Sequence, residues 1–250
     1  MPTRDEYLST LHRDLELFDA AIRAGGDLSQ PVDGCGEWTL ADLAAHLGGL
    51  EHYVAAGIAK GASPDAFPAP PADVAAYADW CAQGAAAIEA ALTASPDDTP
   101  CWTFFPNAPQ EIGTWVRRMT QEHAVHRYDA ELAATGTAEA IDPIIARDGI
   151  DEFLDLFLAR VDKRRPIRIG DLAVQLQSLD GDGDDGAWMV RCGDGPPVVT
   201  REHFRGDVAL QGSANSVLLA LWGRVEPGEM DLEIYGSPDD WARFRAAIAI

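Results

Sequence analysis

Residues 121–129 read Gln121-Glu122-His123-Ala124-Val125-His126-Arg127-Tyr128-Asp129 and place a carboxylate and an imidazole one helical turn apart. Glu122 and His126 stand four positions apart, so their side chains project next to each other from one face of a helix. The helix predicted over 110–135 has this inward-facing stripe: Trp115, Met119, Glu122, His126, Asp129 and Ala133. Burial of one neutral polar group without a partner costs roughly 2–7 kcal/mol. The polar members of the stripe therefore predict a compensating ligand, and a divalent metal is the simplest one.

A second predicted helix supplies a third metal ligand. It begins with the capping box Thr39-Leu40-Ala41-Asp42 and carries a continuous apolar stripe up to Gly61. His46 flanks that stripe, about 40° around the helix from Leu50 and about 60° from Leu43, so it is expected to face the interior. Together with Glu122 and His126 it makes a set of two histidines and one glutamate. Catalytic zinc sites use this set with a fourth position left open, and non-haem iron sites use it too, so the metal stays undecided.

Other interpretations of these residues remain open. Glu122 and His126 could form a surface pair on a helix rotated from the predicted phase. His123 is a weaker candidate ligand, because it lies about 100° around the helix from Glu122. Asp129 could orient the His126 imidazole or could pair with Arg127 or another neighbour, and both readings have equal weight. We expect the remaining histidines to be solvated: His12, His52 and His203.

The N-terminal part of the chain predicts a bundle of four helices. The first covers 4–24 and ends at Gly25-Gly26, and the second runs from Thr39 to Gly61. A proline-rich linker over 61–71 leads to an alanine-rich helix from Pro71 to about Leu92, and a fourth helix follows Asn107 and Pro109. A fifth helix is expected to open at Asp142-Pro143.

From Arg164 onward the apolar period changes from helical to two, which predicts a smaller α+β domain after residue 160. The predicted strands are Ile167–Ile169, Leu172–Leu176, Trp188–Val190 and Val208–Leu210. Short helices are expected from Ser213 to Gly223 and from Ser237 onward. The acidic segment Asp180–Asp185 resembles the start of a calcium loop, but its twelfth position is Arg191 where such a loop needs Glu. A solvated hairpin tip explains it better.

Composition is that of a folded soluble protein, with 250 residues, 47% hydrophobic and 24% charged. No apolar run approaches the roughly 18 residues of a membrane helix, and the N-terminus lacks the apolar core of a signal peptide, so we expect a cytoplasmic protein. A net charge of −22 repels phosphate backbones and anionic lipid surfaces, which predicts no nucleic-acid or membrane partner. The cysteines are scattered without a C-x-x-C motif and are expected to be reduced structural thiols: Cys35, Cys81, Cys101 and Cys192.

Three segments resemble the mycothiol-dependent maleylpyruvate isomerase family, and the likeness spans nearly the whole chain. They are Glu37-Trp38-Thr39-Leu40-Ala41-Asp42-Leu43-Ala44-Ala45-His46-Leu47, the stretch Gln121 to Asp129, and Gly212-Ser213 through Leu219-Ala220-Leu221-Trp222-Gly223-Arg224. The resemblance implies an N-terminal DinB-like four-helix bundle, here 1–160, followed by a smaller α+β domain distantly similar to sterol-carrier folds, here 161–250. It implies zinc held by a histidine of the second helix and a Glu-x-x-x-His pair of the fourth, which fall on His46, Glu122 and His126.

The resemblance also implies an activity. A zinc-dependent enzyme of this kind activates the small thiol mycothiol, either to isomerise a maleylpyruvate-like compound or to transfer the sulfur to an electrophile. The family's essential arginine matches Arg224, although a basic residue there could equally cap its own helix. The alternatives are a non-haem iron enzyme on the same ligands and a non-catalytic metal-binding or regulatory protein.

Overall fold

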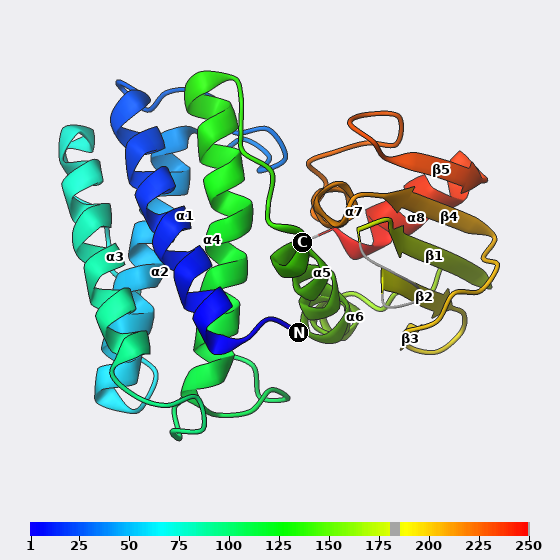
Figure 1. Ribbon diagram of the computed structural model, residues 1–250, viewed down its shortest axis with the longest axis horizontal. Coiled ribbons are helices and arrows are strands. Elements are labelled where there is room, and N and C mark those ends of the chain that lie inside the picture. Colours follow the sequence, from blue (N-terminus) through cyan, green and yellow to red (C-terminus); the bar gives the residue numbers. More distant parts are fainter. Residues whose placement is uncertain (181–185, 250) are drawn as a thin grey trace. The chain divides into compact units, whose positions relative to one another are not determined.

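The computed structural model describes residues 1–180 and 186–249, so most of the predicted hairpin tip at Asp180–Asp185 lies outside the described residues. The chain forms two compact units, Pro2–Ile141 and Asp142–Ile250. The expected order, a helical N-terminal part followed by a smaller part with a sheet, is confirmed (Figure 1). None of the described helices is both long enough and apolar enough to cross a membrane.

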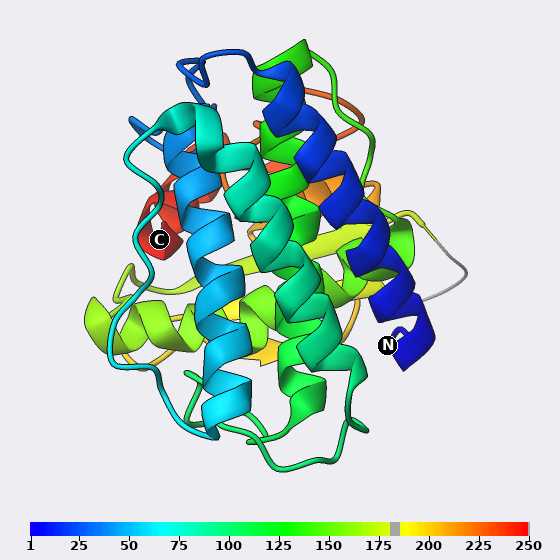
Figure 2. The ribbon, with the colours of Figure 1, turned by 90° about the vertical axis from the view of Figure 1, so that its left-hand side faces the viewer.

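Four long helices build the N-terminal unit, all within described residues: α1 (Arg4–Ala24), α2 (Leu40–Lys60), α3 (Tyr77–Thr93) and α4 (Ile112–Thr135). They lie side by side in Figure 2, with α1 packed chiefly on α4 and α2 packed chiefly on α3. The predicted capping box at Thr39 is observed, and Thr3 forms a second capping box at the start of α1 that was not predicted. Gly61 and Gly136 end α2 and α4 in the left-handed conformation, with φ of 68° and 78°.

Two of these helices begin later than the sequence predicts. A 3-10 turn, η1 (Val74–Ala76), capped by Asp73, precedes α3. Before α4 the chain is extended, because Pro100 and Glu111 pair as an isolated antiparallel bridge and Ile112 N donates to Thr99 O at 3.0 Å. Backbone pairing in this loop therefore takes precedence over the helical start that Asn107 and Pro109 indicate.

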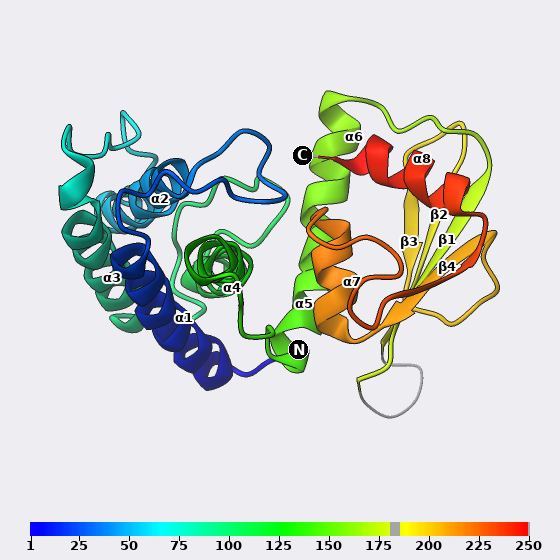
Figure 3. The ribbon, with the colours of Figure 1, turned by 90° about the horizontal axis from the view of Figure 1, so that it is seen from above.

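The C-terminal unit contains a sheet flanked by helices. Its helical elements are α5 (Pro143–Glu152), the π-helical turn η2 (Phe153–Phe157), α6 (Leu158–Arg164), α7 (Ala214–Leu221) and α8 (Pro238–Ile248). The strands are β1 (Leu172–Ser178), β2 (Ala187–Cys192), β3 (Val198–Thr200), β4 (Val208–Gly212) and β5 (Glu233–Gly236), in the order β3-β2-β1-β4-β5. Only β1 and β4 pair in parallel among the described strands. Helices α7 and α8 pack on β1 and β4 from one side (Figure 3).

The structure differs from the sequence-based expectation at two places in this unit. The predicted strand Ile167–Ile169 is wrong: Ile167 N donates to Asp162 Oδ1 at 2.8 Å, which turns the segment back onto α6 instead of into the sheet. The predicted domain boundary near 160 falls inside the C-terminal unit, because α5 packs on α7 and so belongs with the elements that follow it.

Candidate metal centre

The structure brings His46, Glu122 and His126 together. His46 lies on α2, and the other two lie one turn apart on α4. Their candidate ligand atoms all fall within 4.8 Å of one another. His46 Nε2 is 2.9 Å from Glu122 Oε1, and His126 Nε2 is 3.6 Å from the same oxygen. Two imidazole nitrogens and one carboxylate oxygen thus converge on one point, which is a donor set that fits zinc or ferrous iron.

The two carboxylate oxygens of Glu122 have different partners. While Oε1 faces both imidazoles, Oε2 accepts from the Arg118 guanidinium one turn earlier on α4. Burial alone would raise the pKa of Glu122, but the Arg118 charge and the hydrogen bond with His46 hold that pKa well below its usual value. The carboxylate is therefore ionised at neutral pH, as a metal ligand must be. The spacing of Arg118, four residues before Glu122, is a signal that the sequence analysis did not use.

Asp129 fixes the orientation of His126. Its Oδ2 lies 2.9 Å from His126 Nδ1, one turn along the same helix. Arg127, the rival partner expected from the sequence, forms ion pairs with Asp14 and Glu131 instead. With its proton on Nδ1 and directed at Asp129, the imidazole presents the lone pair of Nε2 to Glu122 and His46. The hypothesis that Asp129 orients the imidazole therefore fits the geometry.

The three residues lie at the rim of the helical unit rather than at its centre. The side chains of His46, Glu122 and His126 are 32%, 14% and 13% exposed. The predicted stripe is only one buried face of α4, because the face with His123 and Arg127 lies deeper. The candidate ligands are therefore not sealed in the core of this unit.

Trp38 is an aromatic neighbour of the site that the sequence analysis did not single out as one. Its ring centroid is 5.1 Å from that of His46 and 6.5 Å from that of His126. Trp38 lies in the loop before α2. A loop has no periodic pattern from which the direction of a side chain can be predicted. The Trp38 indole is tilted by 50° to the His46 ring and lies closer to parallel with the His126 ring, at 27°.

The remaining histidines do not join the site. His123 is fully buried next to Glu51, with Nε2 3.4 Å from Glu51 Oε1. His12 and His203 are exposed, as expected. The expectation for His52 is wrong: its side chain is half-buried, with Nε2 3.1 Å from Trp80 O and its ring 5.2 Å from the Trp80 ring. The indole of Trp80 on α3 shields a position that helix phase alone places toward solvent.

Two family models match the chain, one in each of its units. The model for the mycothiol maleylpyruvate isomerase N-terminal domain matches residues 8–131, and the model for the MDMPI C-terminal domain matches residues 145–243. This chain belongs to the mycothiol-dependent maleylpyruvate isomerase family. A search of curated proteins gave no match.

Solved structures of the family show the same fold. A crystal structure of the mycothiol-dependent maleylpyruvate isomerase matches with a TM-score of 0.64 at 12% identity, covering 93% of each chain. A crystal structure of a histidine-to-alanine mutant of the isomerase matches with a TM-score of 0.61 at 12% identity, covering 89% of this chain and 91% of that one. At this identity the likeness establishes the fold and leaves the reaction to be argued from the residues.

In this member of the maleylpyruvate isomerase family, Arg224 follows the C-terminal end of α7. Its Nη1 donates to Trp222 O at 2.7 Å, and its backbone N donates to Leu219 O at 2.8 Å. Trp222 in turn packs edge-on against Phe153 and Phe157, each with ring centroids 5.0 Å away. The aromatic cluster therefore holds the segment that carries Arg224 in place, and the role of Arg224 in a reaction stays a prediction.

Proposed function

We propose that this protein is a zinc-dependent enzyme that uses a low-molecular-weight thiol, mycothiol, to isomerise a maleylpyruvate-like compound. The proposal is supported above all by the convergence of His46, Glu122 and His126 at a partly exposed rim, in a chain of this family. Zinc held by three such ligands lowers the pKa of a coordinated thiol, so that the thiolate is present at neutral pH.

The chain's own residues prepare the donor atoms. Arg118 keeps Glu122 ionised, and Asp129 keeps the His126 proton on Nδ1 so that Nε2 is free to coordinate. His46, the most exposed of the three, completes the set from the neighbouring helix. Before a metal binds, His46 Nε2 donates a hydrogen bond to the ionised Glu122 carboxylate, so this nitrogen can coordinate only after its proton moves to Nδ1 or is released.

The proposed reaction consumes no thiol. The thiolate sulfur adds to a carbon–carbon double bond conjugated with a carbonyl, and the electron pair moves to the carbonyl oxygen as an enolate. Rotation about the new single bond follows. The enolate then re-forms the double bond and expels the thiolate, which gives the trans product. If the enolate carbon is protonated instead, the carbon–sulfur bond persists and the enzyme is an S-transferase.

Arg224 is the residue we assign to the substrate carboxylate. A guanidinium offers two parallel hydrogen bonds to a carboxylate, which an ammonium group cannot reproduce. Arg224→Lys should therefore raise KM by roughly tenfold or more, equivalent to about 1.4 kcal/mol. The exposed Arg168, which pairs with Asp162 in the same unit, provides the matched control, and Arg168→Lys should leave KM unchanged. Equal kinetics for the wild type and Arg224→Lys would contradict the assignment.

The first experiment is elemental mass spectrometry on protein purified without a metal-affinity tag, followed by titration with mycothiol while proton release is measured. Near-stoichiometric zinc together with proton release on thiol binding supports the proposal. Metal without a thiol response contradicts thiol activation and favours a binding or regulatory protein. Incubation with maleylpyruvate then separates the two reactions, because an isomerase leaves the mycothiol concentration unchanged and an S-transferase depletes it.

A further inference from the structure

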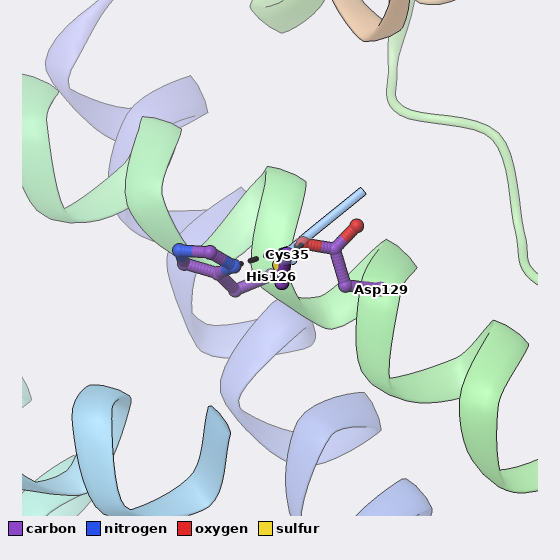
Figure 4. Close-up of side chains that lie close together, drawn as sticks. All are labelled: Cys35, His126 and Asp129. Carbon is purple, nitrogen blue, oxygen red and sulfur yellow. Dashed lines mark hydrogen bonds and ion pairs between the residues drawn. The ribbon is translucent and has the colours of Figure 1, made fainter. Parts of the chain in front are cut away.

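The His126 imidazole is faced by a different donor set at each of its nitrogens. Nε2 faces Glu122 and His46, as described above. At the opposite edge, Cys35, His126 and Asp129 also offer ligand atoms that lie within 4.8 Å of one another (Figure 4). This second set shares His126 with the first and has no role in the proposed reaction beyond the orientation of that ring.

Cys35 reaches this position through the loop between α1 and α2. An isolated bridge between Pro31 and Thr39 closes the loop. The backbone of Cys35 forms two hydrogen bonds: its N donates to Val32 O at 3.2 Å, and its O accepts from Trp38 N at 3.4 Å. These contacts place Sγ 3.5 Å from Asp129 Oδ2, the same oxygen that lies 2.9 Å from His126 Nδ1. Sulfur, oxygen and nitrogen donors thus meet from one loop and one turn of α4.

The chemistry of the second set selects a class of cation. A thiolate is a soft ligand that prefers zinc, cadmium and other thiophilic ions, whereas magnesium and calcium prefer oxygen donors alone. Asp129 is only 3% exposed, so its carboxylate is already largely removed from water and directed at the other two donors. A cation bound here would take the place of the hydrogen bond between His126 Nδ1 and Asp129 Oδ2.

The two sets compete because a neutral imidazole has one protonated nitrogen and one lone pair. When Nδ1 carries the proton and donates to Asp129, Nε2 is the ligand atom and serves the first set. When Nδ1 coordinates a cation, the proton moves to Nε2 and the first set loses one of its three ligands. One ring therefore cannot serve both sets in its neutral form.

We propose that Cys35, His126 and Asp129 form a second binding site, for a thiophilic divalent cation such as cadmium, and that its occupation withdraws His126 from the His46–Glu122 set. The competition rests on the proposed function, whereas the existence of the Cys35 site does not. Cadmium would accordingly inhibit the enzyme by capturing a shared ligand.

The test uses metal-free full-length protein, handled without added thiol under anaerobic conditions and loaded with one equivalent of cobalt(II). Cadmium is then titrated in, while thiolate-to-cadmium charge transfer is followed in the ultraviolet and the cobalt bands in the visible. We expect the charge-transfer band to saturate near one equivalent as the cobalt bands disappear. In Cys35→Ser the band should be absent, and loss of cobalt should need at least about tenfold more cadmium.

Cys81→Ser is the matched control, since Cys81 lies in the same unit with its Sγ against Ala44 O and should behave as the wild type. A charge-transfer band that survives Cys35→Ser, or cobalt bands that persist in the wild type while the ultraviolet band saturates, would overturn the proposal. His46→Ala separates it from the proposed function. That variant should keep the cadmium–thiolate band and lose tight cobalt binding; unchanged cobalt binding would refute the His46–Glu122–His126 site alone.

Discussion

His123 and His126 lie three residues apart on α4 and have opposite environments. His126 is at the rim, with Asp129 2.9 Å from one nitrogen and Glu122 3.6 Å from the other. His123 is fully buried, and neither of its ring nitrogens has a hydrogen-bond partner among the described residues. The nearest acidic oxygen, on Glu51, also lacks one. The same residue type is thus a partnered candidate ligand at one position and an isolated core residue at the other.

The two positions on the helix differ in burial, and burial shifts the pKa values of the groups that lie there. Burial lowers the pKa of His123 to about 3 and raises the pKa of Glu51 well above its usual value. The separation of 3.4 Å between them would suit an ion pair, yet burial without a further partner disfavours the charged form of each group. At the rim, Arg118 keeps Glu122 ionised. The rim therefore offers an ionised carboxylate, as the proposed metal site requires, whereas burial works against charge in the core.

The largest expected effect comes from deletion of a rim ligand. His126→Ala and His46→Ala should each lower zinc affinity by roughly 100-fold or more, because a three-ligand site loses a direct bond and not merely a supporting contact. His52→Ala, on α2 but against Trp80, should leave the affinity unchanged. Competition with a chromogenic chelator measures all three. Equal metal loss in all three variants would refute the ligand assignment and with it the contrast between rim and core.

Replacement of Arg118 should have a smaller effect on the same site. Without the guanidinium, protons compete for Glu122 at a higher pH, so in Arg118→Met the midpoint of cobalt(II) binding should move upward in pH. Supporting contacts of this kind are worth about 10–100-fold in metal affinity. Arg117→Met changes the adjacent, less buried arginine and should leave the midpoint where it is. Midpoints that shift equally in both variants would show a general charge effect instead of a specific contact.

Helical periodicity predicts most of the helices and brings the candidate metal ligands together for one physical reason. Residues four apart share a helix face, so Glu122 and His126 can be paired from sequence, and His46 can be directed inward by its angle from Leu43 and Leu50. The capping box at Thr39 and the N-cap Asp142 followed by Pro143 mark helix starts in the same local manner. Such signals need no knowledge of distant contacts.

The missed features depend on contacts between distant parts of the chain. Trp38 and Cys35 lie in a loop whose path is set by the Pro31–Thr39 bridge. Such a bridge leaves no periodic pattern in the sequence from which it could be predicted. The late start of α4 follows from pairing across the loop that precedes it, and the short strands β3 and β5 have too few residues to show an alternating pattern. His123 could be ranked below His126 by angle, but its complete burial depends on how α1 packs on α4.

The smallest expected effect concerns the core pair and is a change in folding stability. Burial favours the protonated form of Glu51 in the fold, whereas in the unfolded chain Glu51 ionises above its ordinary pKa of 4.5. The unfolded state therefore releases a proton as pH rises, and Glu51 lowers the free energy of unfolding progressively above that pH. Gln is a neutral isostere without this titration. The stability of Glu51→Gln relative to the wild type should therefore increase as pH rises above 4.5.

Urea denaturation of metal-free protein measures this trend, with the exposed Glu37→Gln as the control whose difference from the wild type should not grow. His123 has the opposite dependence: its folded pKa of about 3 lies below the unfolded value of 6.5, so it costs stability as pH falls below 6.5. That contribution is present in both proteins and cancels in the difference. A flat difference for Glu51→Gln would mean that Glu51 is ionised in the fold and paired with a protonated His123. The core would then hold a charged pair, and the chemical distinction between the two histidines of α4 would fail.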